Sequence, residues 1–122
     1  MRCILVVRTH QFNEEFISHE MVHDQVYLFI YVCGNRAGLE VLQFIKPDLV
    51  LIEVQGDMAD SIILSDLMRA QQRVDDVPIL FLDKESVHTQ VVPLQQKPGR
   101  FCLAASCSLP QLLAAVEQLC EA

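Results

Sequence analysis

The sequence predicts one α/β domain, residues 1–122, in which a five-stranded parallel sheet carries helices on both faces in a doubly wound arrangement. The length is about that of one ordinary domain. Five short runs rich in Val, Ile and Leu alternate with segments whose apolar residues recur at helical spacing. Because these runs are continuously apolar through their middle, we expect strands that are buried on both faces.

The predicted strands are short and end near charged residues. The first ends at Arg8, and the third and fourth carry the acids Glu53 and Asp83 near their carboxyl ends. In a parallel sheet the functional crevice lies beyond the carboxyl ends of the strands, so we expect these three side chains near it. The strands are expected at residues 3–7, 26–32, 48–54, 77–82 and 100–104.

The predicted helices connect consecutive strands. In the first connection Phe16, Ile17 and Met21 recur at helical spacing, after residues typical of a helix start. In the fourth connection Pro93 and Pro98 interrupt the chain, so we expect that helix to be short or irregular. The helices are expected at residues 13–24, 36–45, 60–73, 86–92 and 108–119.

The composition argues against several classes of protein. Sixteen acids against nine Lys and Arg give a formal net charge of −7, so we expect no binding to nucleic acid or to anionic lipid. The apolar runs are far shorter than the roughly 20 residues that cross a membrane. The five cysteines are scattered without a C-x-x-C pair, which argues against a disulfide framework or a zinc ribbon. With no signal-peptide pattern at the start, we expect a cytoplasmic protein.

Framework motifs give the chain a family resemblance over almost its whole length. They are Ile-Leu-Val-Val at 4–7, Leu-Glu-Val-Leu at 39–42, Lys-Pro-Asp-Leu-Val-Leu-Ile at 46–52, Val-Pro-Ile-Leu-Phe-Leu at 77–82 and Leu-Leu at 112–113. With these motifs the chain resembles the receiver domains of bacterial two-component response regulators, which have a flavodoxin-like fold. The resemblance implies a single receiver-like domain.

The chain departs from that family at every position that carries phosphotransfer. Active receivers have two Mg²⁺-binding acids where Arg8 and Thr9 stand, and the phospho-accepting aspartate where Glu53 stands. They have Ser or Thr at the position of Asp83 and Lys at the position of Ala105. A bound Mg²⁺ needs oxygen ligands, whereas an arginine brings a permanent positive charge. The resemblance therefore implies a pseudo-receiver, a signalling module that is not an enzyme and needs no cofactor.

The charged residues at the strand ends suggest an internal ion pair. We expect Arg8 to pair with Glu53 or Asp83 across the strand ends, in the place where an active receiver holds its metal ion. The alternative is that these positions carry solvated polar residues with no shared role.

The resemblance also implies an interaction surface. In receivers the face made by the fourth helix, the fifth strand and the last helix meets effector domains or a second copy. We therefore expect a protein partner, either a signalling component or a downstream effector domain, or a homodimer. A solvated edge without a partner is the alternative. In this chain the face would include Val91, Val92, Phe101, Cys102, Gln111 and Gln118.

Two other functions stay open in the crevice at the strand ends. A small molecule could be sensed around Arg8, Glu53, Asp57 and Asp83, or the domain could be phosphorylated by an unusual route. A ligand-binding function would use the same fold without a phosphorylated acid.

A remote alternative comes from the motif H-E-x-x-H. His19, Glu20 and His23 match it, and on a helix this spacing places two zinc-binding histidines on one face with the glutamate as general base. Glu40 is a conceivable third ligand. The simpler interpretation is a pair of polar histidines beside the apolar stripe of the first predicted helix, with no bound metal.

Overall fold

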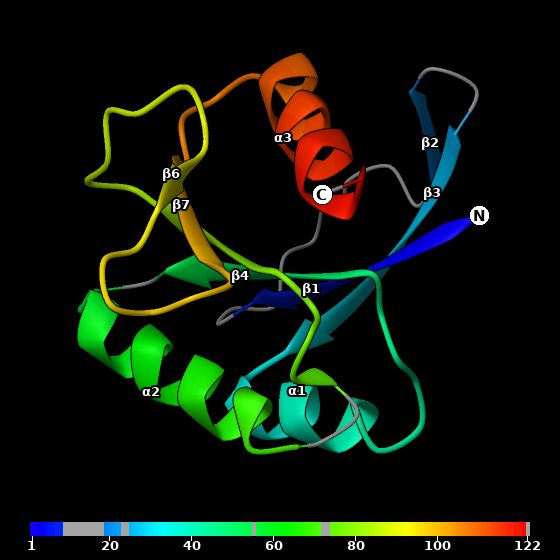
Figure 1. Ribbon diagram of the computed structural model, residues 1–122, viewed down its shortest axis with the longest axis vertical. Coiled ribbons are helices and arrows are strands. Elements are labelled where there is room, and N and C mark those ends of the chain that lie inside the picture. The colour runs from blue at the N-terminus through cyan, green and yellow to red at the C-terminus, as the bar shows by residue number, and fades with distance from the viewer. Residues whose placement is uncertain (9–18, 23–24, 55, 72–73, 122) are drawn as a thin grey trace.

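The computed structural model describes residues 1–8, 19–22, 25–54, 56–71 and 74–121. Within these ranges the chain is an α/β structure with one mostly parallel sheet between helices (Figure 1). The predicted α/β class is confirmed. In chain order the elements are β1 (Arg2–Arg8), β2 (His19–Val22), β3 (Gln25–Cys33), α1 (Asn35–Val41), β4 (Leu49–Val54), α2 (Met58–Arg69), β5 (Ile79–Asp83), β6 (Val92–Pro93), β7 (Arg100–Ala104) and α3 (Leu109–Glu121).

The sheet has the strand order β2-β3-β1-β4-β5-β7-β6. Its inner strands, from β3 to β7, are parallel, and β2 and β6 pair antiparallel at the two margins. The strands predicted from the apolar runs correspond to these inner strands. Because parallel strands end at the same edge of a sheet, Arg8, Glu53 and Asp83 lie along one carboxyl edge.

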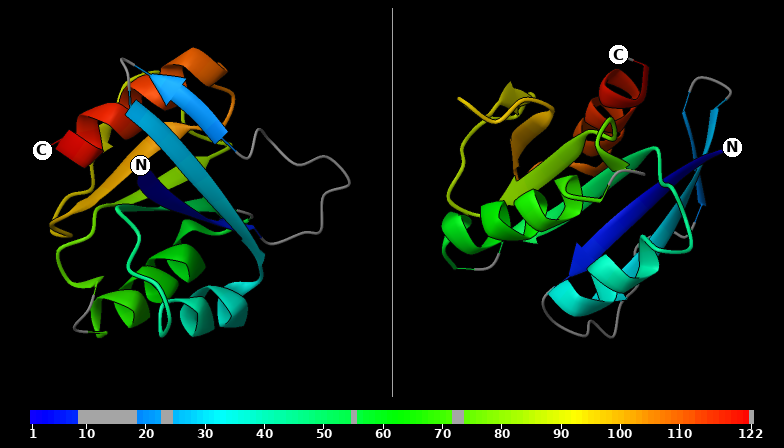
Figure 2. Two further views of the ribbon diagram at one scale, coloured as in Figure 1. Left: turned by 90° about the vertical axis from the view of Figure 1, so that its right-hand side faces the viewer. Right: turned by 60° about the horizontal axis from the view of Figure 1, so that its bottom comes forward.

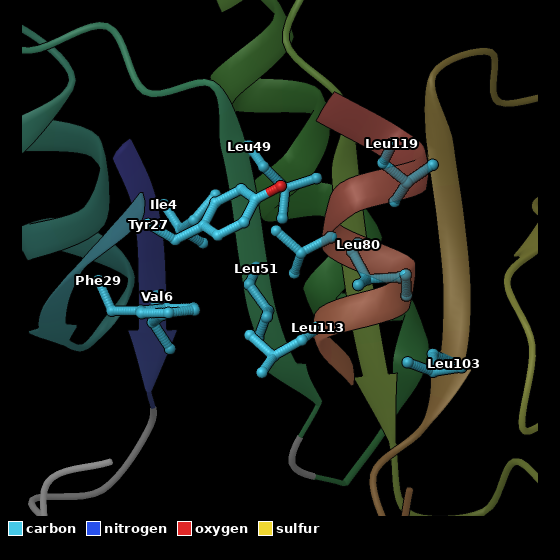
Figure 3. Close-up of a cluster of buried hydrophobic side chains, with 12 residues drawn as sticks. Ile4, Val6, Tyr27, Phe29, Leu49, Leu51, Leu80, Leu103, Leu113 and Leu119 are labelled. Atoms are coloured by element: carbon cyan, nitrogen blue, oxygen red, sulfur yellow. The ribbon is translucent and has the colours of Figure 1, made fainter. Parts of the chain in front are cut away.

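Each face of the sheet has its own hydrophobic core. Along β1, Ile4 and Val6 face α3, whereas Leu5 and Val7 face α1 and α2. This alternation explains why the inner strands are apolar on both faces through their middle, since both faces of the sheet are covered. Figure 1 shows α1 and α2 on one side of the sheet and α3 on the other. Figure 3 shows the α3 side, where Leu113 and Leu119 of the helix meet strand residues.

The first predicted helix is wrong where the structure describes it. Residues His19–Val22 form strand β2, which pairs antiparallel with β3 from His19 opposite Leu28 to Val22 opposite Gln25. The rest of 13–24 lies outside the described residues. The outer backbone groups of β3 need hydrogen-bond partners, and a neighbouring extended segment supplies them. That demand outweighs a helical spacing carried by only three apolar residues. Figure 2 shows β2 beside α3.

The fourth predicted helix is also absent. Residues 84–91 form turns and bends, and 92–93 form β6. This segment follows the outer side of β7: the Ala104 N–H donates to the His88 carbonyl at 2.9 Å, and the Leu94 N–H donates to the Arg100 carbonyl at 2.9 Å. The segment therefore covers the margin of the sheet with backbone hydrogen bonds. Pro93 and Pro98 disfavour a helix in this part of the chain.

The other helices keep their predicted places. α2 begins at Met58, two residues earlier than the periodicity suggests, because the Asp57 carboxylate accepts a hydrogen bond from the Ala59 N–H at 3.0 Å and caps the helix. Over the part of the chain that the structure describes, no helix combines the length and apolar character that a membrane span requires.

Candidate functional site

The predicted pocket residues meet at the carboxyl edge of the sheet. Arg8 is the last residue of β1, Glu53 the next to last of β4, and Asp83 the last of β5. Ala105 follows β7 directly, and its backbone N–H donates to the Asp83 carbonyl at 2.9 Å. Thr9 lies outside the described residues. The edge therefore gathers two acids and one arginine.

Arg8 and Glu53 form an ion pair. The Arg8 Nε lies 3.5 Å from the Glu53 Oε2, and the two side chains are only 6% and 20% exposed. The Arg8 guanidinium carbon also lies 4.7 Å from the centre of the Tyr31 ring, which is cation–π distance. A charge this far from solvent needs such partners, because desolvation of an unpaired ion is costly. The predicted pairing of Arg8 with Glu53 is confirmed.

Strand geometry explains why Glu53 is the partner. Val7 of β1 is in register with Ile52 of the adjacent strand β4, so the backbones of Arg8 and Glu53 are neighbours about 5 Å apart across the two strands. Leu51, two residues before Glu53, faces α3 like Val6, two residues before Arg8. The Cβ atoms of both charged residues therefore lie on the α3 face of the sheet.

The Cβ atom of Asp83 lies on the opposite face of the sheet. Phe81, two residues earlier, belongs to the core on the α1–α2 side. The Asp83 Oδ1 accepts a hydrogen bond from the Glu85 N–H at 3.0 Å, and its carbonyl accepts from the Ser86 N–H at 3.3 Å. Asp83 thus shapes the turn that follows β5.

This arrangement has the wrong charges for a metal site at the edge. The place that a divalent ion would take next to Glu53 holds the Arg8 guanidinium. Within the described ranges, no three His, Cys, Asp or Glu side chains are grouped so that they could hold a metal ion.

The H-E-x-x-H motif lacks the helix that its chemistry needs. His19 and Glu20 lie in strand β2, where each residue advances the chain by about 3.3 Å, and His23 is outside the described residues. A helix would bring the fourth residue after His19 back to the same face within one turn, whereas a strand carries it away. The zinc peptidase alternative therefore loses its structural basis.

The predicted interaction face is divided between the two sides of the sheet. Val91, Gln111 and Gln118 come together in a groove of about 450 Å³ on the α3 side. Phe101 packs against the core of the same side. The remaining lining of this groove consists of Thr89, Gln90, Ala114 and Ala115.

Val92 and Cys102 belong to a different hollow. They are cross-strand neighbours in β6 and β7, and both line a depression of about 520 Å³ on the α2 side that also includes Asp83. Sequence reasoning missed this hollow, because its walls are set by the place where residues 84–95 cross the outer strand. The other lining residues are Met58, Ser86, His88, Pro93, Leu94 and Gln95.

The thiols at these sites are poor nucleophiles. Burial raises the pKa of Cys102, and the nearby negative charge of Asp83 raises it further, while a hydrogen bond with Ser86 opposes the change. Burial likewise raises the pKa of Cys107, which precedes α3. Both thiols therefore stay protonated at neutral pH, and a protonated thiol is not the attacking form.

Comparison with known proteins adds no identification. No protein-family model matches the chain, and no curated protein matches it either.

Proposed function

We propose that this chain is a pseudo-receiver: a non-catalytic signalling module, resembling a response regulator receiver, that acts by binding a protein partner. The order of its parallel strands supports a flavodoxin-like type. Numbered among themselves along the chain, the inner strands run 2-1-3-4-5 across the sheet, which is the order of the flavodoxin-like doubly wound folds. Within the described residues, the departures from that fold are strand β2 at 19–22 and the turns, bends and strand β6 at 84–93, where the sequence predicts helices.

The ion pair between Arg8 and Glu53 carries the proposal. At the positions that the resemblance assigns to a metal ligand and to the phospho-acceptor, the chain has a buried cation bound to a carboxylate. Phosphoryl transfer depends on metal charge and on positioning, and this pair supplies neither. Glu53 is already neutralised within the protein, so the domain holds one state without a phosphoryl group.

The groove on the α3 side is the proposed contact surface. Its amide and hydroxyl side chains, from Gln90, Gln111, Gln118 and Thr89, offer hydrogen bonds without charge. Such a lining suits the backbone of a protein partner, or a second copy of the chain, better than a phosphate backbone, which the net charge of −7 repels. In this proposal the module works in the cytoplasm, away from membranes and nucleic acid.

The absence of phosphotransfer is tested on the full chain. Isothermal titration with MgCl₂, with and without beryllofluoride, should give no heat of binding, and incubation with acetyl phosphate should leave the intact mass unchanged. Binding of Mg²⁺ at millimolar concentration or tighter, or a phosphoryl-sized mass increase on Glu53, would contradict the proposal and favour the atypically phosphorylated alternative.

The contact surface is tested with a matched pair of variants. Gln118→Arg places a charge in the groove, and Gln43→Arg makes the same change in the exposed turn after α1. We expect cross-linking in cell extract to join the same protein to the wild type and to Gln43→Arg but not to Gln118→Arg. Sedimentation equilibrium of the three proteins distinguishes a homodimer. Equal capture by both variants would remove the groove from the proposal.

A second candidate function is the sensing of a small molecule. The observation that favours it is the hollow of about 520 Å³ beside Asp83, a volume in the range of ligand pockets.

A further inference from the structure

The hollow beside Asp83 combines an apolar wall with one carboxylate. Met58 at the start of α2, Val92 and Pro93 of β6, Leu94 and Cys102 supply the apolar side. Asp83 supplies the acid, and its side chain is partly exposed. Among the described residues that line the hollow there is no Lys or Arg to neutralise this acid.

Three hydrogen bonds order the segment 83–88, which forms one wall of the hollow. The Asp83 Oδ1 accepts from the Glu85 N–H at 3.0 Å, and the Ser86 Oγ accepts from the His88 N–H at 3.2 Å. The His88 carbonyl in turn accepts from the Ala104 N–H at 2.9 Å. A cavity whose walls are already ordered loses little entropy when a ligand enters.

The charge of Asp83 acts on the other residues that line the hollow. Its carboxylate contributes to the raised pKa of Cys102, which lies on the neighbouring strand. One carboxylate oxygen is used by the Glu85 N–H, and a carboxylate has further acceptor capacity for a second donor. An incoming cation would therefore meet a negative potential at one end of the hollow and apolar surface at the other.

We propose that this hollow binds an amphipathic cation, an ammonium or guanidinium group carried on an apolar body. The charged group pairs with Asp83, and the apolar body covers Met58, Val92 and Leu94. The same chemistry comes from two sources: a free aliphatic amine, or a basic side chain between apolar residues in a partner's peptide. The proposal does not depend on the pseudo-receiver function, because it uses neither Arg8 nor Glu53.

The test uses two probes with neutral counterparts. Hexylammonium is compared with 1-hexanol, and the peptide acetyl-Leu-Arg-Leu-amide with its citrulline analogue, on the full ¹⁵N-labelled chain. We expect at least one cationic probe to shift the amide signals of Met58, Asp83 and Cys102, with a dissociation constant on the order of 1 mM. Its neutral counterpart should bind about five- to tenfold more weakly, the loss expected for one charge-assisted contact.

Two variants of equal charge change locate the contact. Asp83→Asn keeps an acceptor for the Glu85 N–H, so the turn is preserved while the charge is lost. Asp60→Asn removes an exposed charge of α2 outside the hollow. We expect Asp83→Asn to raise the dissociation constant of the cationic probe about five- to tenfold. Asp60→Asn should change this constant by less than about twofold.

Alkylation of Cys102 provides an independent readout. In alkaline buffer, where part of the thiol is ionised, a bound probe covers the wall that contains Cys102, so iodoacetamide labelling of the Cys102 peptide should slow, while labelling of exposed Cys33 should not. Binding of hexylammonium alone identifies a free amine as the source, and binding of the peptide alone identifies a partner segment. Equal binding of cationic and neutral probes, or binding that Asp83→Asn leaves unchanged, would overturn the proposal.

Discussion

The two ends of the sheet each hold a buried arginine next to a carboxylate, and they use it differently. At the carboxyl edge, Arg8 pairs with Glu53 on the adjacent strand. At the amino edge, Arg100 is 7% exposed and hydrogen-bonds to Asp66 of α2, whose Oδ1 also lies 3.2 Å from the Lys97 Nζ. The first pair joins two strands that the sheet already joins, whereas the second ties a helix and a loop to the sheet.

A second arginine strengthens the amino edge. Arg69, the last residue of α2, donates to the backbone carbonyls of Val74 at 2.7 Å, of Val77, and of Gly99 at 3.0 Å. These bonds connect the end of α2 to the chain before β5 and to the turn before β7. The amino edge is therefore built for stability. At the carboxyl edge, the ion pair of Arg8 and Glu53 joins only two strands that already pair in the sheet.

The largest expected effect is the loss of the Arg69 side-chain bonds. Arg69→Met keeps the apolar stem and removes three hydrogen bonds that a cation donates, so the free energy of unfolding should fall by about 3 kcal/mol. Urea denaturation measures it. The control is Arg36→Met, which removes an exposed i,i+4 pair with Glu40 and should cost less than about 0.5 kcal/mol. Equal losses of stability in both variants would show that the Arg69 hydrogen bonds contribute no more than an exposed ion pair.

A pair of glycines isolates the contact with Arg69. Gly99 and Gly56 have nearly the same backbone angle, with φ of 75° and 76°. A Cβ at Gly99 would lie 2.6 Å from the Arg69 Nη2, whereas a Cβ at Gly56 would meet nothing within 4 Å. Gly56→Ala should cost about 1 kcal/mol for the left-handed backbone alone, and Gly99→Ala about 2 kcal/mol. A thermal unfolding series that finds the two variants equal would show that Arg69 moves aside freely.

Removing the acid at the carboxyl edge should cost less than removing Arg69. In Glu53→Gln the amide keeps a hydrogen-bond acceptor near the Arg8 guanidinium, but the buried cation loses its counter-charge. We expect a loss of about 1.5 kcal/mol in urea denaturation. The matched change at the exposed acid in the first turn of α2, Asp60→Asn, should cost only about 0.5 kcal/mol, the loss of its interaction with the helix dipole. A Glu53→Gln variant as stable as the wild type would mean that the Tyr31 ring and other groups suffice for Arg8.

The smallest expected effect is the pH dependence of the amino edge. Hydrogen bonds from Arg100 and Lys97 hold the pKa of Asp66 below its ordinary value. The folded state therefore binds fewer protons than the unfolded state in the acid range, and the contribution of Asp66 is present above its unfolded pKa and lost as pH falls through the folded one. Because Asp66 is 45% exposed, solvent reduces this contribution to about 0.5 kcal/mol.

The matched variants for this pH dependence are Asp66→Asn and Asp60→Asn. Urea denaturation at neutral pH and near pH 3 should show a smaller difference for Asp66→Asn than for the wild type, whereas Asp60→Asn should keep the full difference. An unchanged difference in Asp66→Asn would show that other acids set the acid stability.

The sequence by itself determined the inner strands and the last helix. Runs such as 3–7 and 49–52 are apolar at every position, and only a strand covered on both faces makes use of that pattern. It also located Arg8, Glu53 and Asp83 at strand ends, since the change from apolar to charged residues marks where burial stops. These are local signals, carried by a few consecutive residues.

Tertiary structure alone decided the partners of these elements. The spacing of Phe16, Ile17 and Met21 favours a helix, yet His19–Val22 pairs with β3. The stabilisation comes from contacts with the neighbouring strand, and the spacing of residues within one segment carries no information about that strand. The partner of Arg8 was settled by register and by the two-residue alternation of strands, which puts Glu53 on its face of the sheet and Asp83 on the other. The hollow beside Asp83 arises in the same way, because its walls come from segments that meet only when the whole sheet is assembled.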